Sequence, residues 1–112
     1  MKIINLTPHP ISLASLAGEI IQTIEPSGQI ARVSTISVDA GYFVCGLPVV
    51  RNTIGEVQNL PPSQEGTAYI VSLFVLSAVV SDRLDVVAPD TGPTCVRDSQ
   101  GRILAVRQFL AA

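Results

Sequence analysis

Alternating apolar and polar positions run through most of the chain and predict β-strands. The clearest case is residues 30–38 (IARVSTISV), where every second position shares a face and β-branched residues are frequent. Similar short patterns, separated by Pro and Gly turns, predict strands at residues 2–6, 11–14, 19–25, 42–45, 47–51, 57–60, 69–72, 85–88, 94–97 and 102–107. This spacing is typical of a mainly β fold, a small barrel or sandwich-like sheet, in one domain over residues 1–112.

Only one segment favours a helix, at about residues 73–80. Ser72 precedes it as an N-cap, whose side chain would accept a hydrogen bond from a free backbone N–H of the first turn. The segment is apolar nearly all round, which predicts burial on several sides. Because Val and Phe also favour extended structure, one long strand is the alternative.

Three turns and the end of the chain complete this picture. Residues 98–101 (DSQG) predict a hairpin, because Asp opens the turn and Gly adopts the left-handed conformation. Gly46 predicts a bend between strands, and residues 52–55 predict a further turn. The apolar residues 109–112 are expected to pack on the core or on a neighbouring subunit.

The composition is apolar and poor in charge. Hydrophobic residues make up 47% and charged residues 14% of the chain, against about 25% charged residues in average domains. The uncharged residues 66–81 are shorter than the roughly 20 apolar residues that span a bilayer, and Pro8 and Pro10 interrupt any signal-peptide-like region. We therefore expect a soluble, cytoplasmic protein with no membrane partner.

The charges indicate which partners to expect. The net charge is −2 and no basic run occurs, so a nucleic-acid partner is not expected. All basic residues except Lys2 are arginines, which bind carboxylates and phosphates in planar, bidentate geometry. With so little lysine to solvate its surface, the protein is expected to form a homo-oligomer.

Metal and cofactor chemistry has little support. The chain has a single histidine and no CxxC pair, so no metal site is expected. Cys45 and Cys95 lie among apolar residues and are expected to be buried free thiols. No glycine-rich phosphate loop occurs, and no cofactor is predicted.

Polar residues in rigid turns are the candidate ligand-binding residues. Asn5, Thr7 and His9 lie where the first strand stops at a Pro-His-Pro sequence. Histidine is the residue type whose charge changes near neutral pH, which suits His9 to a ligand contact, although a rigid turn with the imidazole bonded to the backbone is the plainer interpretation. Ser27 and Arg32 flank a Ser-Gly turn whose N–H groups and guanidinium suit an anion, the alternative being an ordinary β-turn.

A second polar loop lies between Pro89 and Pro93. Asp90 suits a ribose hydroxyl, an amine or an arginine partner, with Thr91 and Arg97 close by in sequence. The alternative is a structural turn in which Asp90 accepts from the backbone N–H of Gly92.

Catalysis is less favoured than binding. A hydrolase would use His9, the only imidazole, with Asp90 and a serine, but no GxSxG nucleophile elbow is present. We therefore predict no catalytic residues and regard an enzyme as the less favoured alternative.

Several motifs occur together in a fixed order. They are NLTPH at residues 5–9, PSG at 26–28 with ARV at 31–33, GEV at 55–57, GTAYIVS at 66–72, DVVAPDTGP at 85–93, VRD at 96–98 and GRI at 101–103. In these motifs the chain resembles, over nearly its whole length, a family of small bacteriophage, prophage and bacterial proteins with no established activity. The resemblance implies a viral protein: a virion component, an inhibitor of a host protein, or a binder of a host signalling molecule.

Together these observations predict a non-enzymatic, phage-type protein that binds a small polar or phosphate-bearing, nucleotide-like ligand at an oligomer interface. Such binding would counter host signalling or defence in the host cytoplasm. The alternative is a structural module, a virion accessory protein or a binder of a host protein.

Overall fold

Ten strands and one short helix make up the chain, and the predicted mainly β class is confirmed. The structure is a computed structural model that describes residues 1–112. The elements are β1 (Lys2–Asn5), β2 (Ile11–Ala14), β3 (Ile20–Ile24), β4 (Arg32–Val44), β5 (Leu47–Gln58), β6 (Thr67–Ile70), α1 (Leu73–Leu76), β7 (Val86–Pro89), β8 (Val96–Arg97), β9 (Ile103–Ala105) and β10 (Phe109–Ala111). They form one four-stranded sheet and three two-stranded ones, and these sheets do not close into a barrel.

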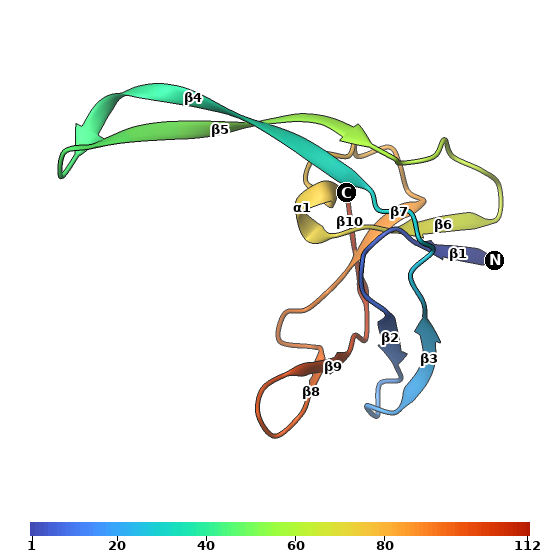
Figure 1. Ribbon diagram of the computed structural model, residues 1–112. Coiled ribbons are helices and arrows are strands. Elements are labelled where there is room, and N and C mark those ends of the chain that lie inside the picture. The colour runs from blue at the N-terminus through green and yellow to red at the C-terminus, as the bar shows by residue number, and fades with distance from the viewer.

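The four-stranded sheet has the order β1-β6-β7-β10 (Figure 1). β1, β6 and β7 run parallel, so α1 lies in the crossover connection that parallel neighbours require. β10 pairs antiparallel with β7, Leu110 lying opposite Ala88. The apolar end of the chain thus packs on its own sheet, the first of the two expected alternatives.

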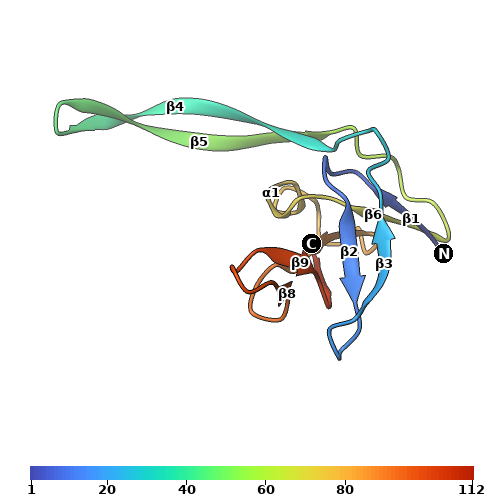
Figure 2. The same cartoon turned by 60° about the horizontal axis from the view of Figure 1, so that its bottom comes forward.

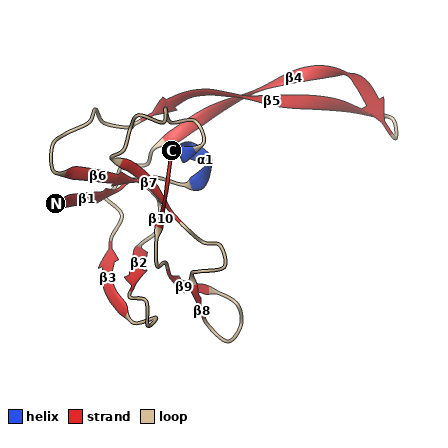
Figure 3. Cartoon of the chain, turned by 180° about the vertical axis from the view of Figure 1, so that it is seen from behind, coloured by secondary structure: helices blue, strands red, loops and turns tan.

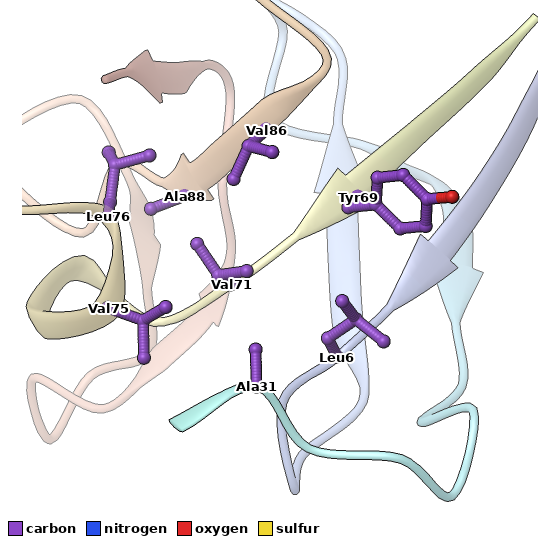
Figure 4. Close-up of a cluster of buried hydrophobic side chains, with 8 residues drawn as sticks. All are labelled: Leu6, Ala31, Tyr69, Val71, Val75, Leu76, Val86 and Ala88. Carbon is purple, nitrogen blue, oxygen red and sulfur yellow. The ribbon is translucent and has the colours of Figure 1, made fainter. Parts of the chain in front are cut away.

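The hydrophobic core lies on one face of this sheet, beneath α1 (Figure 4). Alternate residues of each strand point into it, as the two-residue period of a strand requires. The buried cluster consists of Leu6, Ala31, Tyr69, Val71, Val75, Leu76, Val86 and Ala88. Only 17 of the 112 residues are buried, so much of the apolar composition lies outside the core.

The helix begins where predicted but is shorter than residues 73–80. Ser72 is its N-cap, and the Ser72 side chain accepts from the backbone N–H of Val75 at 3.2 Å. Beyond Leu76 the N–H groups of Ala78 and Val79 donate to carbonyls three residues back, which tightens the last turn and ends the helix. The expected burial of the helix on several sides is wrong. Leu73 and Phe74 are exposed, and only Val75 and Leu76 are buried.

Two short hairpins extend from the sheet, β2–β3 and β8–β9 (Figure 3). The predicted turn at residues 98–101 is confirmed. Asp98 Oδ1 accepts from the N–H groups of Gln100 (2.8 Å) and Arg102 (2.9 Å), and Gly101 has a φ of 83°. The strands on either side are shorter than predicted, since β8 has only two residues.

The longest elements, β4 and β5, pair with each other and project from the rest of the chain as a single hairpin, here called the arm (Figures 1 and 2). At about 3.3 Å per residue the arm reaches roughly 40 Å. At its end the turn residues Cys45 and Gly46 both have positive φ, 51° and 79°, which matches the twist of a two-residue hairpin. The turn predicted at residues 52–55 is wrong: these residues continue β5, with Thr53 opposite Ile36.

The arm makes the molecule much less compact than its length implies. The radius of gyration is 17.0 Å, whereas about 13 Å is typical of a compact domain of this length. No helix is long and apolar enough to cross a membrane.

Candidate functional site

The turn after β1 brings together the first group of predicted ligand-binding residues. Asn5 is buried, and its Nδ2 donates to the carbonyls of His9 (2.8 Å) and Ile24 (3.0 Å). Asn5 Oδ1 accepts from Thr7 N (2.9 Å) and Thr7 Oγ1 (2.6 Å). Every donor and acceptor of the Asn5 amide is therefore used within the chain, and this amide holds the turn in shape.

His9 lies on the outside of the same turn. Its backbone carbonyl accepts the Asn5 bond, while its imidazole makes no hydrogen bond with any side chain or backbone group. The plainer interpretation, an imidazole bonded to the backbone, is therefore not what the structure has. No serine or carboxylate lies within hydrogen-bond distance of the ring, so the arrangement contains no Ser–His–Asp relay.

Ser27 and Arg32 lie close to this turn. The backbone N–H of Ser27 donates to the Asn5 carbonyl at 2.9 Å, and the N–H of Ala31 donates to the Leu6 carbonyl at 3.0 Å. The Ser27 hydroxyl closes a local turn with Gln29. Arg32, the first residue of β4, is exposed and its guanidinium has no hydrogen-bond partner in the chain.

Asp90, Thr91 and Arg97 form a second group, at the end of β7. Asp90 Oδ1 accepts from Gly92 N at 2.9 Å, the structural turn weighed above, and Oδ2 accepts from Gln108 Nε2 at 2.6 Å. The Gln108 bond first, and then the Gly92 bond, lower the pKa of Asp90. Arg97 donates to the Thr91 carbonyl at 3.2 Å and is thus also used within the chain.

By their hydrogen bonds the eight predicted residues fall into two groups. Asn5, Thr7, His9 and Ser27 are connected around the end of β1, with Arg32 following Ala31 in the chain, and Asp90, Thr91 and Arg97 are connected around the end of β7. No hydrogen bond or ion pair connects the groups. Of the eight side chains, three make no hydrogen bond within the chain and are free to contact a ligand: the His9 imidazole, the Arg32 guanidinium and the Thr91 hydroxyl.

The arm is the feature that sequence reasoning missed as a functional element. No residue of β4 or β5 is buried, and the arm carries eight of the large exposed hydrophobic side chains: Ile36, Val38, Tyr42, Phe43, Val44, Leu47, Val50 and Ile54. We call residues 40–50 the arm tip. The arm tip contains no charged residue, and Phe43 and Leu47 are 71% and 69% exposed.

Cys45 lies in the turn of the arm tip and is exposed, so its predicted burial is wrong. The prediction assumed that a thiol among apolar residues lies in the core, but these apolar residues are themselves exposed. Cys95 is buried as predicted, and its Sγ lies 3.6 Å from the Thr91 carbonyl.

A second missed feature is a groove on the sheet face opposite the core. This face groove has a volume of about 470 Å³ and is mostly apolar. Residues contributed by all four strands and a loop line it: Ile3, Ala68, Ile70, Val87, Phe109 and Leu84. The strand residues that line the groove alternate with those of the core, as the two-residue period of a strand requires.

One residue that lines the face groove, Asp85, takes part in an ion pair. Arg83 Nε lies 2.9 Å from Asp85 Oδ1, a second guanidinium nitrogen donates to Asp85 Oδ2 at 3.1 Å, and the same nitrogen donates to the Pro61 carbonyl. The hydrogen bonds from Arg83 hold the pKa of Asp85 below its usual value. The only charged side chain that lines the groove is thus already paired.

No protein-family model matches the chain, and no curated protein or solved structure matches it. The resemblance to phage proteins therefore stays a prediction.

Proposed function

We propose that the protein is a non-enzymatic structural module that self-associates through its β4–β5 arm. The observation that carries this proposal is an arm of about 40 Å with no buried residue. A two-stranded hairpin alone is marginally stable in water at best. Within its own chain the arm packs only at its base, where Val33 and Val57 lie against the core. A bound protein surface would supply the packing that the rest of the arm lacks.

The surface area of the chain supports the same proposal. The chain exposes 7466 Å², whereas a compact protein of its mass exposes about 5,900 Å². The excess of roughly 1,500 Å² exceeds the ~800 Å² that each partner contributes to an interface of standard size. The extended chain therefore presents more than enough surface for a stable contact.

In this proposal the protein is a phage-type accessory protein, acting in the cytoplasm of a bacterial host or as part of a virion. The family resemblance in the NLTPH and DVVAPDTGP motifs supports that setting. A structural role also agrees with the internal use of most polar turn residues.

The test is the oligomeric state in solution, measured by light scattering after size exclusion over a range of concentrations. We expect the wild type to be oligomeric and Phe43→Glu, which places a charge in the arm tip, to be monomeric. Leu16→Glu is the matched control, because Leu16 is 93% exposed in the β2–β3 turn, away from the arm. A wild type that stays monomeric at high micromolar concentration would rule out self-association.

A nucleotide-like ligand at the β1–β2 turn is a second candidate, supported by the unpaired His9 imidazole and Arg32 guanidinium. An arginine with all its donors free suits a phosphate. Nucleotides and cyclic nucleotides at saturation should raise the melting temperature of the wild type but not that of Arg32→Ala. Arg102→Ala, another exposed arginine, is the control. Thermal stability unchanged by every nucleotide tested in the wild type would contradict this candidate.

A further inference from the structure

The arm tip and the face groove are both apolar, both uncovered, and lie on different parts of the chain. We propose that the arm tip of one copy binds in the face groove of a second copy. This inference rests on the proposed self-association and specifies its geometry, a head-to-tail contact between two different surfaces.

The chemistry of the two surfaces is complementary. The arm tip offers Tyr42, Phe43, Val44 and Leu47, all more than half exposed, with no charge to desolvate. The face groove offers apolar strand residues, and its only charged side chain, Asp85, is paired with Arg83. Burial of the tip would therefore remove apolar surface from water on both copies without burying an unpaired charged side chain.

The size of the face groove fits side chains rather than a whole element. Its volume of about 470 Å³ lies in the ~300–1,000 Å³ range of sites that enclose a small ligand. A few aromatic and aliphatic side chains projecting from a narrow hairpin end match this volume. The shaft of the arm does not match this volume, because it is a whole two-stranded ribbon rather than a few side chains.

The arm of the same chain does not reach its own face groove. The arm projects away from the four-stranded sheet in each view (Figures 1 to 3), and no residue of β4 or β5 lines the groove. The occupant has to come from another molecule, and a second copy carries a fitting arm tip.

Pairing of two arms along their shafts is less well supported. Polar residues lie on both faces of the shaft, since Ser37 is opposite Asn52 on one face and Arg51 is opposite Val38 on the other. Near the tip, Pro48 has no N–H to add to a new ladder, which disfavours strand addition at that edge. The apolar side chains are instead concentrated at the end of the arm, where docking by side chains is favoured.

A head-to-tail contact has a consequence for the assembly. Because each copy has one arm tip and one face groove, copies can add one after another. Association stops if a ring closes, and otherwise an open chain of copies grows. A variant that lacks either surface can still supply the other, which makes a complementation experiment possible.

The experiment mixes two variants. Phe43→Glu disables the tip, and Ala68→Arg places a long charged side chain in the face groove. We expect each variant alone to be monomeric and an equimolar mixture to form 1:1 heterodimers, since one intact tip and one intact groove remain. Native mass spectrometry distinguishes the heterodimer by mass. Gln100→Arg, which adds the same charge in the exposed β8–β9 turn, should leave the wild-type assembly unchanged.

Folding of the variants is checked independently by circular dichroism and melting temperature. If Ala68→Arg does not fold, Leu84→Glu replaces it, because Leu84 is 84% exposed at the rim of the groove and tolerates a charge. An oligomeric wild type whose folded groove variant remains oligomeric would overturn this inference while leaving self-association intact. A mixture that gives no heterodimer, the result expected for tip-to-tip pairing, would likewise overturn this inference and leave self-association intact. A monomeric wild type would overturn both proposals.

Discussion

In the four-stranded sheet, alternate side chains are buried beneath α1, whereas in the arm the same strand alternation leaves every side chain at least partly exposed, and only Val33 and Val57 at its base pack against the core. Tyr69, Val71 and Val86 are almost completely inaccessible, while Ile36 and Val38 in β4 are about half exposed or more. Both regions are rich in β-branched residues and both form regular ladders. The difference is the layer that covers the strands. Helix α1 of the same chain covers the sheet, whereas no element of the chain covers the arm beyond its base.

This comparison separates two contributions to stability. In the sheet, hydrophobic burial adds to backbone hydrogen bonding. In the arm of a single copy, the ladder and cross-strand side-chain pairs act almost alone, and each such pair contributes only roughly 0.2–1 kcal/mol. Matched substitutions in the two regions should therefore have very different effects on an isolated monomer, and the predictions below use such pairs in the monomeric Phe43→Glu background.

The largest difference is expected for truncation of aliphatic side chains. Leu6→Ala removes a core side chain that is 1% exposed and should lower the free energy of unfolding by about 2–5 kcal/mol. Ile36→Ala in the arm, where Ile36 is 61% exposed, should lower it by less than about 0.5 kcal/mol. Chemical denaturation measures both. Equal losses would show that the arm is packed in the monomer, contrary to the structure.

A smaller difference is expected for two asparagines. Asn5→Asp replaces two donated hydrogen bonds with a buried charge, leaving the His9 and Ile24 carbonyls without their donor. The free energy of unfolding should fall by about 3 kcal/mol. Asn52 in the arm is exposed, and Asn52→Asp keeps the oxygen that accepts a hydrogen bond from Ser37. The free energy of unfolding, measured by chemical denaturation, should therefore change by no more than about 0.5 kcal/mol. If Asn5→Asp were equally mild, the amide would not be what holds the β1–β2 turn.

The sequence predicted features that depend on nearby residues. The N-cap at Ser72, the turn at residues 98–101 and the strand through residues 32–38 are set by short-range propensity and turn chemistry. It did not predict the parallel pairing of β1 with β6, because their separation along the chain leaves no local signal. Residues 52–55 were misassigned as a turn because Asn and Gly favour turns, whereas pairing with β4 overrides that preference.

Candidate site residues were predicted less completely, for a related reason. Asn5, Thr7 and Asp90 were correctly read as polar residues of rigid turns, but sequence does not show whether a polar group already has an internal partner. Gln108, which bonds Asp90, lies 18 residues away along the chain. The arm tip was missed because periodicity shows which residues share a face and not whether another element covers that face.

The smallest difference concerns two carboxylates and pH. Arg83 lowers the pKa of Asp85, so this pair stabilises the folded state above the unfolded pKa of about 4. That contribution is lost as the pH falls through the lower, folded pKa. Asp85→Asn should cost about 1 kcal/mol at neutral pH and progressively less in acid. Asp39→Asn in the arm retains the oxygen that accepts from Gly41 N and should leave stability unchanged at both pH values. Unfolding of the two variants at pH 7 and pH 3 measures this. A cost for Asp85→Asn that is as large at pH 3 as at pH 7 would place its origin in lost packing at the groove rather than in the ion pair.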